Sequence, residues 1–416
     1  MDDIVIVGSG IAGHRAAAEI HRLAPDRTVH VVGSEPGRPY DRPPLSKEYL
    51  LAPEPVTPHL RPGEIYEARV VLRERLRAVE IDRAGHVVRL SDGSSLPYDK
   101  LLLATGSRLR RMSLPAVDPA RVFYLRTLED AVRLRAALTM HKRVVIIGGG
   151  FIGLEVAAAA RQRDCDVTVL EMAPSLLSRG ATPPLADYVR AMHVRRGSRI
   201  VLNARADDVT EGATGMTLRW HGGEVTADIL VVGIGIVPNV ELAAACGLAT
   251  IDGIVVDHQC RTLDPSIFAA GEVTNYPVGQ LGLRARTESW SASTDQAIVA
   301  ANNMLGGEST FVSLPWFWSD QYDVNIQCLG IPNLASRFLQ LGDMASDNWM
   351  RIGVDELGRL IGAEAVNMGR EISALRRADR TGQPIPARLI EQASHEEASR
   401  LSTHFSDEAL VKGALS

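Results

Sequence analysis

The chain has 416 residues, 45% of them hydrophobic and 23% charged, and a formal net charge of −5. This is ordinary globular composition with room for two or three domains, and it gives no reason to expect nucleic acid as a partner. The four cysteines are scattered, which argues against a disulfide framework and a metal site. The N-terminus has no basic segment and the apolar runs are short, which argues against a signal peptide and a membrane span. Together these features predict a cytoplasmic protein.

The opening stretch has the pattern of a dinucleotide-binding unit. We predict a buried strand at residues 4–7, a glycine turn at 8–13 and a helix at 15–23. A second strand at 29–32 and an acid at 35 follow. Gly8 permits the tight turn, Gly10 lets a pyrophosphate approach the backbone, and Gly13 lets the helix pack closely on the strand. The N–H groups of the helix N-terminus favour the phosphates, and the Glu35 carboxylate can accept hydrogen bonds from a ribose.

The loop of residues 39–47 brings two cations, Arg42 and Lys47, into a segment that leaves the glycine turn. Its prolines favour an extended backbone, and Ser46 is a possible cap for the short helix that follows. The two cations could face a bound cofactor or belong to a solvated basic loop, and the sequence alone favours neither interpretation.

Residues 69–103 predict further strands, with a hairpin turn at Asp92 and Gly93. The last of these strands leads into the small-residue turn of residues 104–106, where backbone could approach a ligand. The basic cluster that follows, with arginines at 108, 110 and 111, is either solvated surface or a docking patch for an acidic partner.

The opening pattern then occurs a second time. The capping box of Thr127 and Asp130 first marks a helix that is expected to reach about Met140. The strand of the second pattern lies at residues 144–147, its glycine turn at 148–153 and its helix at 154–163. Its second strand lies at 167–170 and its acid at 171. Two complete patterns predict two bound dinucleotides. Glu171 can accept hydrogen bonds from both ribose hydroxyls and would repel a 2′-phosphate, and no cation follows it before Arg179, so NADH is expected rather than NADPH.

Glycines again follow buried strands beyond this unit, at the turns around Gly235 and at Gly271, which precedes Glu272. A helix is expected at residues 289–305. The pattern then changes to antiparallel strands at residues 324–329, 338–341, 349–354 and 359–365. A helix is expected from Gly369 onward, and a charged tail from about residue 384. The fold class is therefore α/β, with two Rossmann-like dinucleotide-binding domains plus a C-terminal α+β domain.

Three stretches carry a resemblance to a known family: residues 42–47, 148–155 and 315–322. Together they make residues 1 to about 380 resemble the oxygenase-coupled NADH-dependent ferredoxin reductases, which have a glutathione-reductase-like fold. The resemblance implies a discontinuous FAD-binding domain at 1–110 and 244–314, an NADH-binding domain at 111–243, and a C-terminal domain at 315–416 that covers the flavin.

By the same resemblance, the first glycine turn holds FAD and the second holds NADH. The implied FAD contacts are Gly8, Gly10, Ala12, Gly13, Glu35, Arg42, Lys47, Val79, Ala104, Thr105, Gly106, Arg126, Gly271, Glu272, Trp290 and Trp318. The implied NAD contacts are Gly148, Gly150, Phe151, Ile152, Gly153, Glu155, Glu171 and Gly235. One departure concerns Glu272, because the family usually has Asp at this position and the local FAD contact is therefore changed by one methylene.

The resemblance also implies the catalytic residues Lys47, Glu155 and Trp318. Lys47 would lie near flavin N5 and pair with Glu155, which lies beside the nicotinamide. Trp318 would lie against the isoalloxazine on the side where ferredoxin docks.

The implied activity is electron transfer from NADH through FAD to a [2Fe–2S] ferredoxin, which feeds a Rieske-type oxygenase or a haem monooxygenase, by a monomer or weak homodimer. A flavin suits this task because it takes two electrons together and returns them singly. An NADH oxidase or peroxidase and a redox-signalling flavoprotein that resembles apoptosis-inducing factor are the alternatives. Residues 40–42 read Tyr-Asp-Arg where related disulfide reductases and NADH oxidases carry cysteine, which argues against both of those enzyme classes.

Overall fold

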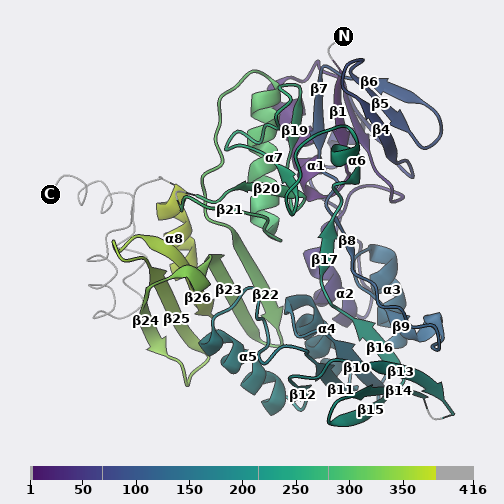
Figure 1. Cartoon of the computed structure of the whole chain (residues 1–416), viewed down its shortest axis with the longest axis vertical. Helices are drawn as coiled ribbons and strands as arrows, with labels where there is room; N and C mark the ends of the chain where they lie inside the picture. Colours follow the sequence, from purple (N-terminus) through teal and green to yellow (C-terminus); the bar gives the residue numbers. More distant parts are fainter. Residues whose placement is uncertain (1–2, 68, 214, 280, 381–416) are drawn as a thin grey trace. The chain divides into compact units, whose positions relative to one another are not determined.

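The computed structural model describes residues 3–67, 69–213, 215–279 and 281–380, and the tail predicted from about residue 384 lies outside them. The chain divides into two compact units, each made of three segments (Figure 1). The first unit comprises Met1–Asp41, Pro58–Arg108 and Val237–Phe317. The second comprises Arg42–Thr57, Leu109–Ile236 and Trp318–Ser416.

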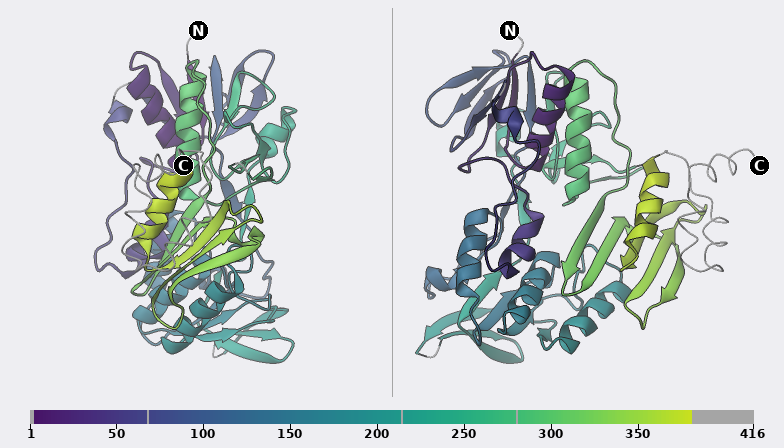
Figure 2. Two further views of the ribbon diagram at one scale, coloured as in Figure 1. Left: turned by 90° about the vertical axis from the view of Figure 1, so that its left-hand side faces the viewer. Right: turned by 180° about the vertical axis from the view of Figure 1, so that it is seen from behind.

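The first unit is built on a five-stranded parallel sheet. Its strands, in spatial order, are β19 (Ile267–Ala269), β7 (Lys100–Leu103), β1 (Ile4–Val7), β2 (Val29–Val32) and β3 (Val70–Arg73). Helices α1 (Ile11–Leu23) and α7 (Trp290–Met304) lie side by side against this sheet (Figure 2). The central strand β1 is apolar and buried along its whole length, because both faces of a parallel sheet are covered.

Smaller sheets complete this unit. They are formed by β4 (Ala78–Asp82), β5 (Val87–Leu90) and β6 (Ser95–Pro97), and by β18 (Ile254–Val255), β20 (Thr274–Pro277) and β21 (Arg284–Ala285). The turn between β5 and β6 contains Gly93 at φ +85°, which confirms the predicted hairpin. A short helix, α6 (Glu241–Ala245), follows β17 (Ile236–Pro238).

The second unit repeats the plan of a parallel sheet. Its strands are β12 (Arg199–Val201), β11 (Asp166–Leu170), β10 (Arg143–Ile147), β16 (Ile229–Val232) and β9 (Val122–Phe123). The helices of this part are α2 (Glu48–Leu51), α3 (Leu128–Ala137), α4 (Phe151–Gln162) and α5 (Pro183–Arg195). An antiparallel sheet of β13 (Asp208–Gly212), β14 (Gly215–Trp220) and β15 (Gly223–Ala227) is attached to it.

The second unit also contains the C-terminal antiparallel sheet. Its strands are β22 (Trp316–Gln321), β23 (Val324–Gly330), β26 (Leu360–Val366), β25 (Asn348–Val354) and β24 (Arg337–Asp343). Helix α8 (Gly369–Arg380) follows the sheet. This agrees with the four antiparallel strands and the helix predicted from the sequence, whereas the first strand of the sheet, β22, was not predicted. None of the described helices combines the length and the apolar character that crossing a membrane requires.

The helix starts show where local sequence rules succeed and where they fail. Thr127 and Asp130 form the predicted capping box, although α3 ends at Ala137, before the expected Met140. Helices α1 and α4 begin at Ile11 and Phe151, earlier than predicted, because Gly10 and Gly150 act as their N-caps and the last glycine of each turn is already helical.

The loop of residues 39–47 differs from its prediction. Residues Pro43–Ser46 form a short 3₁₀ helix rather than an extended loop, since proline is tolerated in the first turn of a helix. Lys47, not Ser46, is the N-cap residue of α2. The Ser46 hydroxyl instead donates a hydrogen bond to Glu155. Its partner is therefore a buried carboxylate and not the backbone N–H groups of α2.

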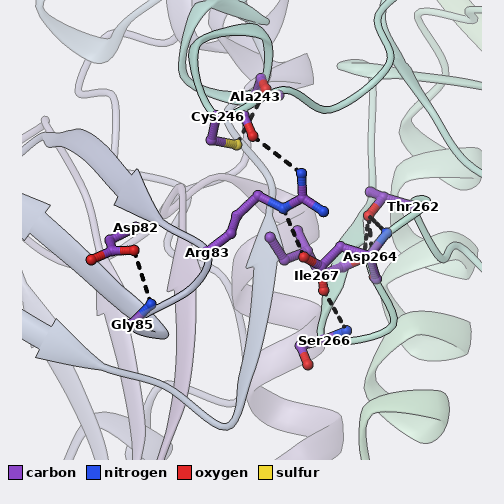
Figure 3. A network of polar contacts seen from close by, with 9 residues as sticks. All are labelled: Asp82, Arg83, Gly85, Ala243, Cys246, Thr262, Asp264, Ser266 and Ile267. Carbon is purple, nitrogen blue, oxygen red and sulfur yellow. Dashed lines mark hydrogen bonds and ion pairs between the residues drawn. The ribbon is translucent and has the colours of Figure 1, made fainter.

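One polar network joins three segments of the first unit. The Arg83 side chain donates to Asp264 Oδ2 at 2.7 Å and to the carbonyl oxygen of Cys246 at 3.3 Å (Figure 3). The guanidinium holds the pKa of the Asp264 carboxyl below its usual value against the opposing effect of burial. The turn after β4 is thereby fixed to the loop before β19 and to the end of α6.

A second polar network joins α5 to the C-terminal sheet within the second unit. Glu364 on β26 is fully buried, and it accepts hydrogen bonds from the backbone N–H of Thr182 at 2.5 Å and from the Thr182 hydroxyl. The Arg351 guanidinium lies 3.8 Å from Glu364 Oε2. Burial raises the pKa of Glu364, and the Thr182 bonds and Arg351 partly oppose that rise.

We predict that Glu364→Gln changes how stability depends on pH. A carboxyl whose folded-state pKa is raised contributes stability that is present below its ordinary value of 4.5 and is lost as the pH rises through the raised value. The amide has no such loss. The free energy of unfolding of the variant relative to the wild type should therefore increase with pH, by about 1.4 kcal/mol for each unit of pKa shift.

Urea unfolding at a series of pH values measures this difference. The matched control is Glu356→Gln, because Glu356 is an exposed acid in the same sheet region. A difference between Glu364→Gln and the wild type that stays constant with pH would contradict a raised pKa at Glu364.

Candidate functional site

In the first glycine turn, the first and last glycines are in close contact with backbone, and the middle glycine faces open space. A Cβ atom on Gly8 would lie 2.0 Å from the Ala104 carbonyl oxygen, and one on Gly13 would lie 1.8 Å from the Gly8 carbonyl oxygen. A Cβ atom on Gly10 would meet nothing within 4 Å among the described residues. The turn therefore requires glycine at Gly8 and Gly13, and a phosphate has room to approach at Gly10 and the N-terminus of α1.

Two other predicted turns reach the same end of this sheet. Residues 104–106 follow β7 beside β1, and Thr105 exchanges hydrogen bonds of 2.8 Å with Asn239. Gly271 follows β19 at φ +91°, and a Cβ atom on it would lie 3.1 Å from Ala12 Cβ. The first unit thus brings Ala12, Ala104, Thr105 and Gly271 around its glycine turn.

The other predicted FAD contacts of the first unit lie on the segments that follow. Glu35, after β2, accepts a hydrogen bond from the Tyr40 hydroxyl. Trp290, the first residue of α7, donates from its indole to Asp41 at 2.8 Å. Val79 on β4 is 58% exposed, and Glu272 follows Gly271. Their contacts with a cofactor stay predictions.

The second glycine turn has the same geometry as the first. A Cβ atom on Gly148 would lie 2.3 Å from the Gly233 carbonyl oxygen, and one on Gly153 would lie 2.3 Å from the Gly148 carbonyl oxygen. Gly150 again faces open space, with nothing within 4 Å among the described residues. Gly233 follows β16 as Ala104 follows β7, so the residues at both turns fit a dinucleotide.

Glu171 is held by backbone at the end of β11. Its two carboxylate oxygens accept hydrogen bonds of 2.7 Å from the N–H groups of Gly149 and Ala173. A carboxylate has about four lone-pair positions, so it can still accept hydrogen bonds from ribose hydroxyls. Met172 beside it is 71% exposed, and the Arg179 guanidinium lies close to Gly235, 2.9 Å from where a Cβ atom would stand.

A buried ion pair joins the loop of residues 42–47 to α4. The Lys47 ammonium lies 3.1 Å from Glu155 Oε1, and the two side chains are 9% and 2% exposed. The interpretation of Lys47 as part of a solvated loop is therefore wrong. Glu155 also accepts hydrogen bonds from the hydroxyls of Ser46 and Ser319, the latter at 2.6 Å.

The surroundings of this pair set its electrostatics. Burial raises the pKa of the Glu155 carboxyl, and Lys47 is the strongest of the groups that oppose the rise. The Lys47 ammonium lies 5.9 Å from the centre of the Trp318 ring. The second unit thus brings together the three residues predicted to be catalytic.

Other predicted residues of the second unit have contacts or exposure of their own. Arg42 donates to the carbonyl oxygen of Arg126 at 2.6 Å, while Ile152, in the first turn of α4 next to Phe151, is 49% exposed. Of the basic cluster, Arg108 lies in the first unit and pairs there with Glu241 at 2.7 Å, and Arg111 in the second unit lies over the Tyr124 ring. A docking role for this cluster stays a prediction.

Sequence reasoning missed four polar residues that support Glu155. They are Ser46, His193, Ser319 and Gln321, which are all buried. Period-two alternation on β22 was an available signal, because two polar residues on one face of a strand flank the exposed Asp320. Ser46 and His193 offered no such signal, since their partners are far away in the sequence.

Comparisons with known proteins agree with this geometry. A family model described as pyridine nucleotide-disulphide oxidoreductase matches residues 2–297, and one described as reductase C-terminal matches residues 316–396. The anthranilate 1,2-dioxygenase system ferredoxin–NAD(+) reductase component of Burkholderia cepacia is 43% identical over 94% of this chain and 97% of its own. Rhodocoxin reductase of Rhodococcus erythropolis is 39% identical over 92% of this chain and 90% of its own.

The likeness extends to solved structures. A crystal structure of the covalent putidaredoxin reductase–putidaredoxin complex matches with a TM-score of 0.89 and 31% identity, over 97% of this chain and 98% of the other. The α/β prediction with a C-terminal reductase domain is therefore confirmed. The chain belongs to the pyridine nucleotide-disulphide oxidoreductase family, in its branch of oxygenase-coupled ferredoxin–NAD(+) reductases, which are oxidoreductases that use FAD and NAD(H).

Proposed function

We propose that this protein is the reductase of an oxygenase system and passes electrons from NADH, through FAD, to a [2Fe–2S] ferredoxin. The observation that carries the proposal is the pair of glycine turns, each with an open middle glycine at a helix N-terminus, because two dinucleotides need two such places. The names of the relatives support the choice of a ferredoxin as acceptor. The oxygenase would be of the Rieske type or a haem monooxygenase.

FAD is assigned to the first turn and NADH to the second. Bound FAD supplies the ability to accept two electrons together and release them one at a time. The chain's own residues bind and orient: Gly10 and the α1 N-terminus hold the FAD pyrophosphate, and Gly150 and the α4 N-terminus hold that of NADH. We also propose the other FAD and NAD contacts named in the sequence analysis. The proposed domain boundaries are 1–110 with 244–314 for FAD, 111–243 for NADH and 315–416 for the C-terminal domain.

Lys47, Glu155 and Trp318 are assigned to the cofactor-facing side of the second unit. A buried ammonium stabilises negative charge that develops next to it, and Glu155 keeps that ammonium in one place. The Trp318 ring offers a flat apolar surface for a flavin or nicotinamide ring. We also propose a cytoplasmic location, which the four free cysteines support.

The first test is NADH consumption in air by the FAD-loaded protein, with and without a [2Fe–2S] ferredoxin from an oxygenase system. Slow consumption alone that rises steeply with ferredoxin is expected, and NADPH should support little consumption. Equally fast NADH consumption without ferredoxin would instead identify an NADH oxidase. Slow consumption with every acceptor tried would point to a signalling flavoprotein.

A second prediction concerns the choice between NADH and NADPH. Glu171→Ala with Met172→Arg removes a carboxylate that repels a 2′-phosphate and adds a guanidinium that can bind one. The ratio of kcat/KM for NADH to that for NADPH should fall by about a hundredfold, which corresponds to about 2.7 kcal/mol. Steady-state kinetics with both nucleotides measures it, and Asp187→Ala, at an exposed acid on α5, is the control that should leave the ratio unchanged.

A third prediction concerns the ion pair. Lys47→Ala removes the ammonium and leaves Glu155 buried without its counter-ion, so the rate of flavin reduction by NADH should fall by about a hundredfold. Stopped-flow absorbance of the flavin measures this rate. An unchanged rate together with an unchanged flavin potential would remove Lys47 from the site.

A further inference from the structure

A chain of buried hydrogen bonds links Glu155 to helix α5. His193 Nε2 lies 2.8 Å from Gln321 Oε1, and Gln321 Nε2 lies 3.0 Å from Ser319 Oγ. Ser319 Oγ lies in turn 2.6 Å from Glu155 Oε1. His193, Ser319 and Gln321 are 0% exposed and Glu155 is 3% exposed, so bulk water does not compete with these bonds.

The secondary structure places these side chains in one line. Ser319 and Gln321 alternate along β22 and therefore point to the same side of the strand, whereas Asp320 between them is exposed. His193 comes from the last turn of α5 and Glu155 from the second turn of α4. All four residues belong to the second unit.

The ion pair between Lys47 and Glu155 determines which group donates and which accepts in each of these hydrogen bonds. An ionised carboxylate only accepts hydrogen bonds, so Ser319 must donate to Glu155 and accept from Gln321. The amide nitrogen of Gln321 then faces Ser319, and its oxygen faces His193. His193 Nε2 must therefore carry the ring proton.

The far end of the chain agrees with this direction. Burial lowers the pKa of His193, which favours the neutral ring with a single N–H group. Its Nδ1 atom, then an acceptor, lies 3.5 Å from the Tyr322 hydroxyl, which can donate. Charged groups near this end are Arg196, whose guanidinium lies 5.2 Å from the centre of the Tyr322 ring and pairs with Asp323, and Arg161.

A proton on Glu155 would allow the opposite arrangement. Glu155 would donate to Ser319, Ser319 to the oxygen of Gln321, and the Gln321 amide to an unprotonated Nε2, so that His193 would carry its proton on Nδ1. The protonation state of Glu155 and the tautomer of His193 are thus coupled through two uncharged side chains.

We propose that His193 and Gln321 are positioning residues that fix Ser319 as a hydrogen-bond donor to Glu155 and so keep the carboxylate aligned with Lys47. This deepens the proposed function and rests on it, because Lys47 and Glu155 are assigned there as groups that face the cofactors. A contact that only joined α5 to β22 would need neither a fixed tautomer nor a polar connection to Glu155.

The first test reads the His193 tautomer directly. Nitrogen NMR of the FAD-loaded protein with ¹⁵N-labelled histidine, with the His193 signals assigned by loss in His193→Gln, should show the proton on Nε2 at neutral pH. A proton on Nδ1 would overturn the proposal. Tyr188→Phe is the matched control, because it removes a 2.7 Å hydrogen bond from α5 to Asp347 that is not part of the series from His193 to Glu155. It should leave the His193 tautomer unchanged.

The second test measures the effect on Glu155 and Lys47. Gln321→Met keeps the length of the side chain but removes its hydrogen bonds to His193 and Ser319. The rate of flavin reduction by NADH should fall about tenfold, because Ser319 loses the buried hydrogen bond that fixes it as a donor to Glu155. In a Glu155→Gln background the same change should have little further effect. Tyr188→Phe should reduce the flavin at the wild-type rate.

Ser319 provides a second pair of variants in case Gln321→Met folds poorly. Ser319→Ala should slow flavin reduction to a similar degree, and Ser319→Thr, which keeps the hydroxyl, should restore it. If Gln321→Met and Ser319→Ala both keep the wild-type rate while the wild type delivers electrons to ferredoxin, this inference fails and the proposed function stands. If the wild type delivers none, the proposed function fails, and the His193 tautomer alone decides the hydrogen-bond chain.

Discussion

The close approach of backbone at four glycines is the constraint on which the rest of the structure depends. At Gly8, Gly13, Gly148 and Gly153 a Cβ atom would stand between 1.8 and 2.3 Å from a carbonyl oxygen. A side chain at Gly13 or Gly153 would push the helix away from the turn, and one at Gly8 or Gly148 would push the turn away from the loop after the neighbouring strand. The tight fit directs the N-termini of α1 and α4 at the open space beside Gly10 and Gly150.

The second unit adds buried charge to this framework. Glu155 and Glu364 each lose hydration in the interior, and each is compensated by a cation and by hydroxyl or amide donors. Such pairs contribute little net stability, because desolvation offsets most of the Coulomb attraction. Their value lies in permitting one arrangement: Glu364 fixes α5 to the C-terminal sheet, and that sheet carries Ser319 to Glu155.

The sequence predicted what depends on local chemistry. Both glycine turns, the capping box at Thr127, the hairpin at Gly93 and the antiparallel C-terminal strands follow from residues close together in the chain. It did not predict Ser46 as a donor to Glu155 or His193 as a partner of Gln321, because residues 109 and 128 positions apart meet only in the folded chain. Local propensity favoured a helix cap for Ser46, and the demand of a buried carboxylate for donors outweighed it.

The two glycine turns share their geometry, so the difference between the nucleotides they accept must come from what surrounds them. Glu35 accepts a hydrogen bond from the Tyr40 side chain, and Glu171 accepts one from each of two backbone amides. A carboxylate anchored by backbone keeps its position when side chains nearby change, and a carboxylate beside the ribose disfavours a 2′-phosphate. In the proposed function, this backbone-held carboxylate is the part of the second turn that distinguishes NADH from NADPH, and that nucleotide has to be selected again in every catalytic cycle.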